Sequence, residues 1–218
     1  MPILTREDLQ KQTRKRLLLA AQKEIVKKGV SEASIRDIAK AAGYTMGAFY
    51  SNFASKETML EELIAVHMRE EILVFKEITT NAARGKKEDT WKAISNWLKG
   101  MRKNKNISAL GFELQMYANR NPLFRKKFDS AKAQRLKDLA DGLGALFDVH
   151  GLKPKIDCFQ VAVSLAALWD GFFIHRTVPG AMPDDQLILF FLKALLDDSV
   201  PIRGAKQKNI NLGGSHGA

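Results

Sequence analysis

The sequence predicts an all-α protein, and three observations carry that prediction. Apolar residues recur at helical spacing through most of the chain, helix start and stop signals separate these segments, and the alternation expected of strands is nowhere convincing. The chain of 218 residues is long enough to bury roughly 70% of its unfolded surface. We expect about nine helices, in a small N-terminal head of three helices and a larger helical body.

The first two helices of the head are predicted from periodicity and capping. Apolar side chains repeat at helical spacing over residues 9–28, and Gly29 then supplies a stop signal. Ser34 is a suitable N-cap for a second helix, which is expected to end at Gly43. Two helices joined by a short turn that contains a glycine follow from this pattern.

A short third helix is predicted from its cap, Thr45, to about Phe53. Its length of roughly 13 Å suits the major groove of DNA. Phe49 and Phe53 lie four residues apart and are expected to anchor the helix to the core, which leaves its opposite face to a partner. The stretch GYTMGAFYSNF contains no Lys or Arg. Positive charge for a phosphate backbone must therefore come from residues that flank this helix.

The rest of the chain is predicted to be a series of longer helices. A fourth helix opens with the start signal at Ser55 and continues toward Ile78, and the stretch NAARGKK then interrupts the pattern. The later helices are expected at residues 89–103, 107–120, 122–148, 156–178 and 184–198, with Pro122 at a permitted first-turn position and PGAMP as the break before the last helix. Residues 201–218 have little to bury, and we expect them to be disordered.

Composition limits the class of protein. A single cysteine, Cys158, rules out an intrachain disulfide, and no apolar run approaches the roughly 20 residues that span a bilayer. The start of the chain lacks the apolar region of a signal peptide, so we expect a soluble, cytoplasmic protein without a membrane partner. The formal net charge is +11, and residues 84–137 alone hold 15 basic against 4 acidic residues. That excess is a solvated face, an attraction to DNA or a site for an anionic ligand.

The stretch from Thr13 to Leu60 closely resembles the DNA-binding head of the TetR family of transcriptional regulators. The matching features include the Thr-Arg pair before a Leu/Ala-rich helix, the SIRDIAKAAG turn, Gly47, the Phe49-Tyr50 pair and the closing SKE. The resemblance implies a TetR-like fold, with a helix-turn-helix DNA-binding domain over residues 1–58 and an effector-binding and dimerisation domain over residues 59–200.

The resemblance also implies which head residues contact double-stranded DNA. The expected contacts are Arg14, Ser34, Arg36, Thr45, Met46, Gly47, Ala48, Tyr50, Ser51, Asn52 and Lys56. The alternative for Ser34 and Thr45 is that they only cap helices. Met46 offers an apolar contact to a thymine methyl group but no bidentate contact to guanine, so the operator sequence does not follow from the chain.

For the body, the resemblance implies a homodimer that reads a palindromic operator, and a cavity for a small-molecule effector. The apolar last two helices fit an intersubunit interface. The expected effector is largely apolar, with an anionic effector as the alternative. The candidate lining residues are Trp97, Met101, Phe112, Met116, Tyr117, Trp169, Phe172 and His175. The alternative for each of them is ordinary core packing.

We expect a repressor that an effector releases from DNA, and not an enzyme. The four histidines are scattered, no glycine-rich phosphate loop is present, and we expect no cofactor and no metal site. The other alternative is a helical ligand-binding or scaffold protein that does not bind an operator. Gly47, Tyr50 and Lys56 favour the regulator over that alternative. Effector binding is expected to shift the fourth helix and so change the spacing of two recognition helices.

Overall fold

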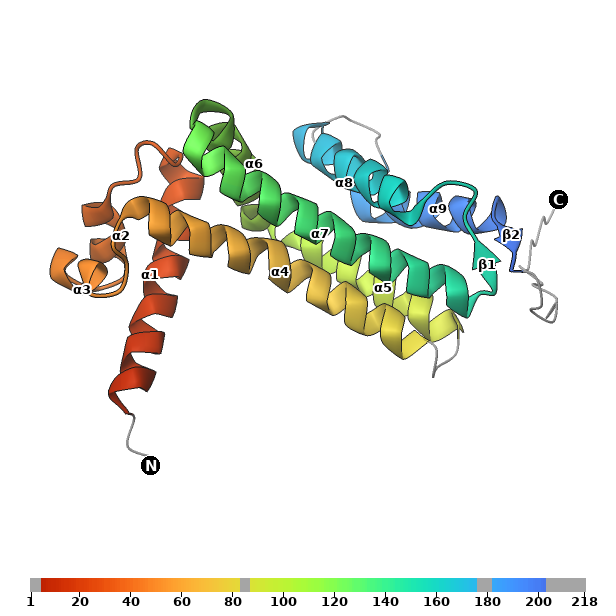
Figure 1. The fold of residues 1–218 in the computed structure, drawn as a ribbon, viewed down its shortest axis with the longest axis horizontal. Coiled ribbons are helices and arrows are strands. Elements are labelled where there is room, and N and C mark those ends of the chain that lie inside the picture. Colours follow the sequence, from red (N-terminus) through yellow and green to blue (C-terminus); the bar gives the residue numbers. More distant parts are fainter. Residues whose placement is uncertain (1–4, 83–86, 176–181, 203–218) are drawn as a thin grey trace.

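A computed structural model describes residues 5–82, 87–175 and 182–202. Within these ranges the chain is an elongated, helical molecule with its first three helices gathered at one end (Figure 1). The predicted all-α fold is confirmed. The helices are α1 (Arg6–Lys28), α2 (Ile35–Ala41), α3 (Met46–Tyr50), α4 (Lys56–Ala82), α5 (Lys87–Lys103), α6 (Lys105–Arg120), α7 (Pro122–Val149), α8 (Cys158–His175) and α9 (Asp184–Asp197).

Local signals in the sequence set the first two helices of the head. Thr5 and Asp8 form a reciprocal capping box that starts α1 three residues before the predicted position. Gly29 ends α1 with a φ of 84°, a left-handed conformation that favours glycine. The hydroxyl of Ser34 caps α2 as predicted, because it accepts the amide of Asp37 at 3.1 Å.

The third helix is shorter than the sequence predicts. Thr45 caps it as expected, but α3 ends at Tyr50 and not near Phe53. The reason lies in the two polar side chains that follow. Ser51 Oγ donates to the carbonyl of Gly47, and Asn52 Nδ2 donates to the carbonyl of Ala48. Such local bonds give the backbone an alternative to the helical pattern, so the chain turns before it reaches Phe53.

The long helix α4 connects the head to the body and lies alongside α7 over much of its length (Figure 1). Its start signal is confirmed, since Ser55 Oγ accepts the amide of Thr58 at 3.1 Å. Two buried clusters hold the molecule together. The first joins the head to the early part of α4, to α6 and to the start of α7. The second lies among α4, α5, α7, α8 and α9. The domain boundary after residue 58 stays a prediction.

The C-terminal part of the chain contains a strand pair that the sequence did not predict. The strands β1 (Leu152–Lys153) and β2 (Val200–Pro201) pair in antiparallel fashion. Two residues are too few to produce a visible alternation. Pro122 opens α7 as predicted. The predicted break PGAMP lies mostly outside the described residues, as does the predicted disordered tail from residue 203 on. The first two residues of that predicted tail are ordered instead, because Pro201 belongs to β2 and the amide of Ile202 donates to the carbonyl of Gly151 at 3.0 Å.

Candidate functional site

The short helix α3 presents an exposed face at the head end of the molecule. Phe49 and Phe53 are buried, with ring centroids 5.5 Å apart, and they fix the inner side of this segment to the core. On the outer side, Met46 is 40% exposed and Tyr50 is 53% exposed. Gly47 lies between them and is also exposed. The absence of a side chain at Gly47 lets another molecule approach the backbone closely.

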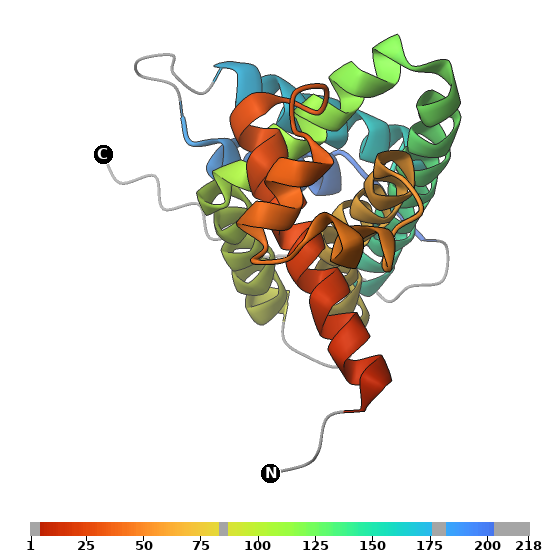
Figure 2. The same ribbon diagram turned by 90° about the vertical axis from the view of Figure 1, so that its left-hand side faces the viewer.

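The residues just before α3 extend this exposed face. Ser34, at the start of α2, and Arg36, in its first turn, are both exposed. Thr45 is exposed as well, and its Oγ1 caps α3 by accepting the amide of Ala48 at 3.2 Å. The capping role of Ser34 and Thr45 is therefore present, and each hydroxyl keeps its own hydrogen as a donor. Figure 2, seen from the head end, shows α1, α2 and α3 facing the viewer together.

Two of the predicted basic contacts are engaged inside the protein. The Arg14 guanidinium pairs with the carboxylate of Glu62, with Nε 2.9 Å and 2.8 Å from the two oxygens, and also donates to the carbonyl of Asn52. It lies 4.2 Å from the ring centroid of Phe53. Arg14 thus ties α1 to α4 and to the end of α3.

Lys56 is likewise held by the head. Its ammonium donates to the carbonyls of Val30 and Ser31, in the turn between α1 and α2. Partial burial lowers the pKa of Lys56, because it withdraws the charged amine from water. Asn52 is half-buried and its amide donates to the carbonyl of Ala48, which is itself half-buried. Ser51 is exposed, although its hydroxyl donates to the carbonyl of Gly47. The exposed candidates are Ser34, Arg36, Thr45, Met46, Gly47, Tyr50 and Ser51.

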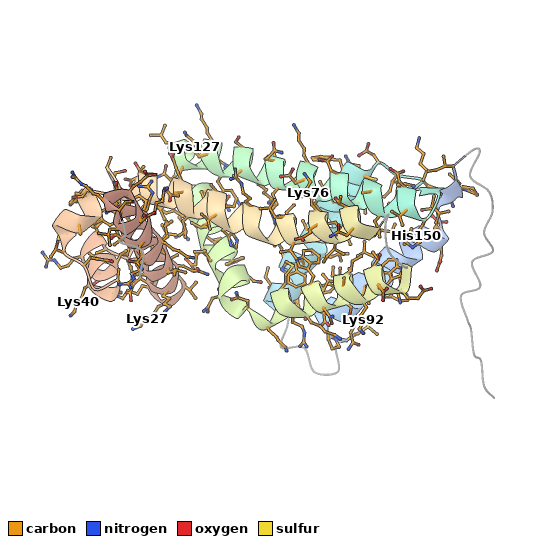
Figure 3. The ribbon with its side chains drawn as sticks, turned by 90° about the horizontal axis from the view of Figure 1, so that it is seen from below. Lys27, Lys40, Lys76, Lys92, Lys127 and His150 are labelled. Atoms are coloured by element: carbon orange, nitrogen blue, oxygen red, sulfur yellow. The ribbon has the colours of Figure 1, made fainter. Side chains whose placement is uncertain are left out.

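The basic excess of residues 84–137 is partly paired. Arg125 Nε lies 3.7 Å from Asp129 Oδ2, and Lys127 Nζ lies 3.6 Å from Glu61 Oε2. Figure 3 shows Lys127 projecting from the body near the head, whereas Lys92 projects from α5 much farther along the molecule. These charges are dispersed over the body and do not gather beside α3.

A cavity of about 160 Å³ lies between α4, α6, α7 and α8. Its walls combine aromatic rings with charged and polar groups. The lining residues are His67, Met68, Ser108, Gly111, Phe112, Gln115, Phe128, Lys132, Arg135, Trp169, Asp170 and Ile174. A second, mainly apolar cavity of about 50 Å³ includes Trp97 and Met101. Arg135 and Trp169 line both cavities, so the two are neighbours.

Half of the predicted effector residues line these cavities. Phe112 and Trp169 line the first cavity, and Trp97, Met101 and Trp169 line the second. Four predicted residues line neither of them: Met116, Tyr117, Phe172 and His175. Helical periodicity explains why Phe112 lines the cavity and Tyr117 does not, since the two lie on different sides of α6. The side that faces the cavity carries Ser108, Gly111, Phe112 and Gln115. The side that is buried in the first cluster carries Leu110, Leu114 and Ala118.

Tyr117 belongs to the head side of α6. Its ring packs edge-on against Phe124 with centroids 4.9 Å apart, and its hydroxyl accepts Asn121 Nδ2 at 3.2 Å. Tyr117 therefore packs in the core, which was the alternative to lining the effector cavity. His175 is exposed at the end of α8, away from both cavities.

Sequence reasoning missed the titratable groups of the first cavity. Burial lowers the pKa of His67 to about 4, and the charge of Arg135 acts in the same direction, so the imidazole is neutral near pH 7. Burial raises the pKa of Asp170, against the opposing effect of Arg135 and Lys132. A Cβ on Gly111 would lie 3.0 Å from His67 Nε2, so this glycine makes room for the imidazole. The only sequence signal was the helical spacing of Lys132 and Arg135.

Within the described ranges, no group of three His, Cys, Asp or Glu residues could hold a metal ion. No helix in the same ranges is long and apolar enough to cross a membrane. The site thus consists of an exposed helical face at one end and two neighbouring cavities in the body.

A capped helix pair with a short exposed helix, set on a larger helical body, defines the helix-turn-helix class of regulator. The family profile described as "Bacterial regulatory proteins, tetR family" matches residues 17–63. This segment of the chain is therefore similar to the DNA-binding part of TetR-family transcriptional regulators.

Curated relatives match over a short stretch of the chain. The chain is 45% identical over 53 residues to an HTH-type transcriptional regulator of Bacillus subtilis, YdgC, across 24% of this chain and 27% of the relative. It is 37% identical over 60 residues to the HTH-type transcriptional regulator TtgR of Pseudomonas putida, across 28% of each chain. The matched segment thus spans little more than a quarter of these relatives.

Solved structures match nearly the whole fold at low sequence identity. A protein from Rhodococcus sp. assigned to the TetR family superposes with a TM-score of 0.70 at 17% identity, over 85% of this chain and 99% of that one. Reduced NemR of Escherichia coli gives a TM-score of 0.66 at 18% identity, over 88% of this chain and 99% of that one. These structures extend the likeness of fold from the head to the body.

Proposed function

We propose that the protein is a sequence-specific DNA-binding transcriptional regulator of the cytoplasm, and that it acts as a repressor. The observation that carries this proposal is the exposed face of α3, where Met46, Gly47 and Tyr50 are turned outward by the burial of Phe49 and Phe53. A helix that is held this firmly on its inner side can enter a major groove without reorganisation. Base edges would then meet Met46, Gly47 and Tyr50, while Ser34, Arg36 and Thr45 would reach phosphates.

We infer that Arg14 and Lys56 act chiefly by positioning. Arg14 joins α1 to α4, and Lys56 anchors the turn between α1 and α2, so both fix the orientation of α3 relative to the body. Their charge adds to the field of the head without requiring a direct contact. The alternative, a ligand-binding protein without an operator, lacks a reason for exposing Met46 and Tyr50 side by side.

Selection from random-sequence DNA tests the proposal directly. The full chain is expected to enrich a palindromic site whose half-sites lie about one helical turn, or a multiple of it, apart. A Tyr50→Ala variant should lose this enrichment, whereas an exposed substitution far from the head, such as Lys92→Ala, should retain it. If the wild-type protein enriches no palindrome, with or without effector, the regulator proposal is wrong.

We propose that the two neighbouring cavities receive a small, largely apolar effector that carries an acidic group. The second cavity offers an apolar lining, whereas Lys132 and Arg135 supply positive charge in the first. Neutral His67 adds a hydrogen-bonding group without a charge of its own. Phe112 provides a flat apolar surface in the first cavity, and Trp169 provides one that both cavities share.

Matched ligands of equal chain length separate charge from hydrophobicity. Octanoate should raise the melting temperature of the protein and quench its tryptophan fluorescence more than octanol or octylamine does. Lys132→Gln should reduce the difference between octanoate and octanol, and Lys126→Gln, outside the cavity, should leave it unchanged. Equal shifts with the acid and the alcohol would mean that the cavity does not select an anion.

The position of α6 supports a route from this cavity to the head. One side of α6 lines the cavity, and its other side belongs to the buried cluster of the head. Glu113 on α6 comes close to the end of α1, since a Cβ at Gly29 would lie 3.2 Å from its Oε2. Helix α4 lines the cavity with His67 and Met68 and packs under the head with Met59. We infer that an effector shifts α4 and α6 and thereby the two recognition helices of a homodimer.

A further inference from the structure

The first half of α1 is a projecting arm, residues 5–16, that has no buried residue. The first buried side chain of this helix is Leu17. Figures 1 and 2 both show this part of α1 extending past the rest of the head. Its start is fixed by the capping box of Thr5 and Asp8. The arm is therefore an ordered helix of about 18 Å and not a loose terminus.

The projecting arm is basic. It contains Arg6, Lys11, Arg14, Lys15 and Arg16 against Glu7 and Asp8. Arg14 pairs with Glu62 and Lys11 pairs with Glu7. Across the described part of the chain, no ion pair engages Arg6 or Arg16, and both side chains are exposed. The matched family segment begins at residue 17, so the arm lies outside what the family profile covers.

One side of the arm is turned toward the segment that directly precedes α3. Thr13 Oγ1 lies 3.4 Å from the hydroxyl of Tyr44, which directly precedes the α3 cap. Arg6 and Arg16 lie seven residues before and three residues after Thr13, so both share its side of the helix. Lys11 and Lys15 lie two residues to either side of Thr13, which places them on the opposite side of α1.

We propose that Arg6 and Arg16 bind two backbone phosphates of the DNA next to the segment that α3 enters. This inference rests on the proposed function, because it extends the same interface. The two residues are separated by ten positions, or about 15 Å along the helix, so one arm can reach two phosphates that are not adjacent. Fork-shaped guanidinium groups suit phosphate oxygens. The arm adds affinity and salt dependence, not base selectivity.

A pair of double variants tests this division of the arm. Arg6→Gln with Arg16→Gln removes two charges from the side of Thr13, and Lys11→Gln with Lys15→Gln removes two from the opposite side. The dissociation constant of the full chain is measured from 50 to 200 mM salt on the duplex that the wild-type protein selects from random DNA. The first variant should lower the slope of log K against log salt by about 1.8, which is two phosphates at about 0.9 each. The lysine variant should change it by much less.

The outcomes separate the arm from the proposed function. If the wild-type chain selects no duplex, the proposed function fails and the arm fails with it. If the wild-type chain binds and both double variants change the slope equally, only general charge is involved and the arm proposal is wrong. An unchanged slope in the arginine variant also overturns it. Arg6→Lys with Arg16→Lys, which keeps both charges, should restore most of the slope. Thermal unfolding of each variant checks that the fold is intact.

Discussion

Arg14 and Lys56 are basic residues of the head whose charged groups are engaged inside the protein. Arg14 meets a carboxylate, a backbone carbonyl and the face of Phe53 at once. Lys56 crosses from the start of α4 to the turn that follows α1. Each basic group holds two elements in a fixed orientation relative to each other. The exposed face of α3 can therefore lack Lys and Arg and still be held in one orientation.

Substitutions at Met46 on α3 and at Lys56, which anchors the head, are expected to change DNA binding in different ways. Met46→Ala removes an exposed apolar contact, so it should change the preference among duplexes by about 1 kcal/mol at one base pair. Lys56→Ala should weaken binding to all duplexes alike, because it releases the turn at Val30 and Ser31. Binding to a panel of single-base-pair variants of the selected site measures both. Equal, sequence-independent losses from the two variants would contradict this separation.

His67 is expected to make the folded protein sensitive to acid. Its pKa is about 4 in the folded protein against 6.5 for an ordinary histidine. Between these values the unfolded chain binds a proton that the folded chain excludes, so the free energy of unfolding falls as the pH falls. The loss is at most about 1.4 kcal/mol for each pH unit. Urea unfolding of wild type and His67→Gln from pH 7 to pH 4.5 measures it, and the variant should have the shallower dependence.

The comparison with His67→Gln isolates the histidine from its neighbours. Lys132, Arg135 and Asp170 line the same cavity. Burial raises the pKa of Asp170, so the folded chain keeps that proton to higher pH than the unfolded chain does. Asp170 therefore makes the free energy of unfolding rise as the pH falls, opposite to the effect of His67. Asp170 is present in both proteins and cancels in the difference. His175→Gln, at an exposed position, controls for removing a histidine. Parallel pH profiles for wild type and His67→Gln would refute the expectation.

At the scale of the element, capping signals made most of the fold predictable. Ser34, Thr45, Ser55 and Pro122 act by local chemistry, and each begins a helix where the sequence places it. The end of α3 was not predictable in the same way. Apolar spacing carried the predicted helix to Phe53, but Ser51 and Asn52 bond back to the α3 backbone and turn the chain earlier.

The cavity was predictable only in part, because its lining comes from several helices. Large aromatic residues suggested Phe112 and Trp169, which line it, and equally Tyr117, which packs in the head core. Residue type alone does not distinguish the two sides of α6. His67 and Asp170 are single polar residues on two different helices, and only tertiary packing brings them together. No local pattern in the sequence carries that information.

Two glycines of α7 are expected to respond to alanine in opposite directions. A Cβ on Gly142 would lie 2.8 Å from Phe75 Cε1, and that ring is buried and stacked on Trp97 at a centroid distance of 5.0 Å. Gly142→Ala should therefore destabilise the protein by about 1 to 3 kcal/mol. Gly144 has nothing within 4 Å of its Cβ position, so Gly144→Ala should stabilise it by up to about 1 kcal/mol. Chemical denaturation measures both, and changes of the same sign would contradict the packing argument.

At the scale of the whole molecule, the net charge of +11 is a poor guide to the interface. Its largest excess lies in residues 84–137, dispersed over the body, where Lys127 pairs with Glu61. The head carries a smaller excess, and the projecting arm holds the largest part of it, with five basic against two acidic residues. Charge-reversal of Arg125, Lys126 and Lys127 is expected to leave the salt slope of DNA binding nearly unchanged, as a solvated face would.

The last two helices carry an unpartnered apolar surface. Their inner sides pack in the second cluster through Val161, Ala162, Ile188 and Leu192. The outer side of α9 exposes Phe190 and Phe191, and Phe190 is 58% exposed. The rings of Phe190 and Phe191 lie edge-on with centroids 5.7 Å apart. Isolated chains rarely leave so much apolar surface in water, so a second copy of the chain is the expected cover.

Phe190→Glu is expected to convert a dimer to a monomer, because an isologous interface meets the introduced charge twice. Light scattering over a range of concentrations should give the dimer mass for wild type and the monomer mass for the variant. The matched control is Leu123→Glu, at an 81% exposed leucine on α7, which should stay dimeric. The two linked heads of a dimer bind a palindrome together, so Phe190→Glu should also lower the affinity for the palindromic duplex by at least tenfold. Wild type and variant should have similar affinities for a duplex that contains only one half-site. A monomeric wild type, or a variant that remains dimeric, would rule out this surface as the interface.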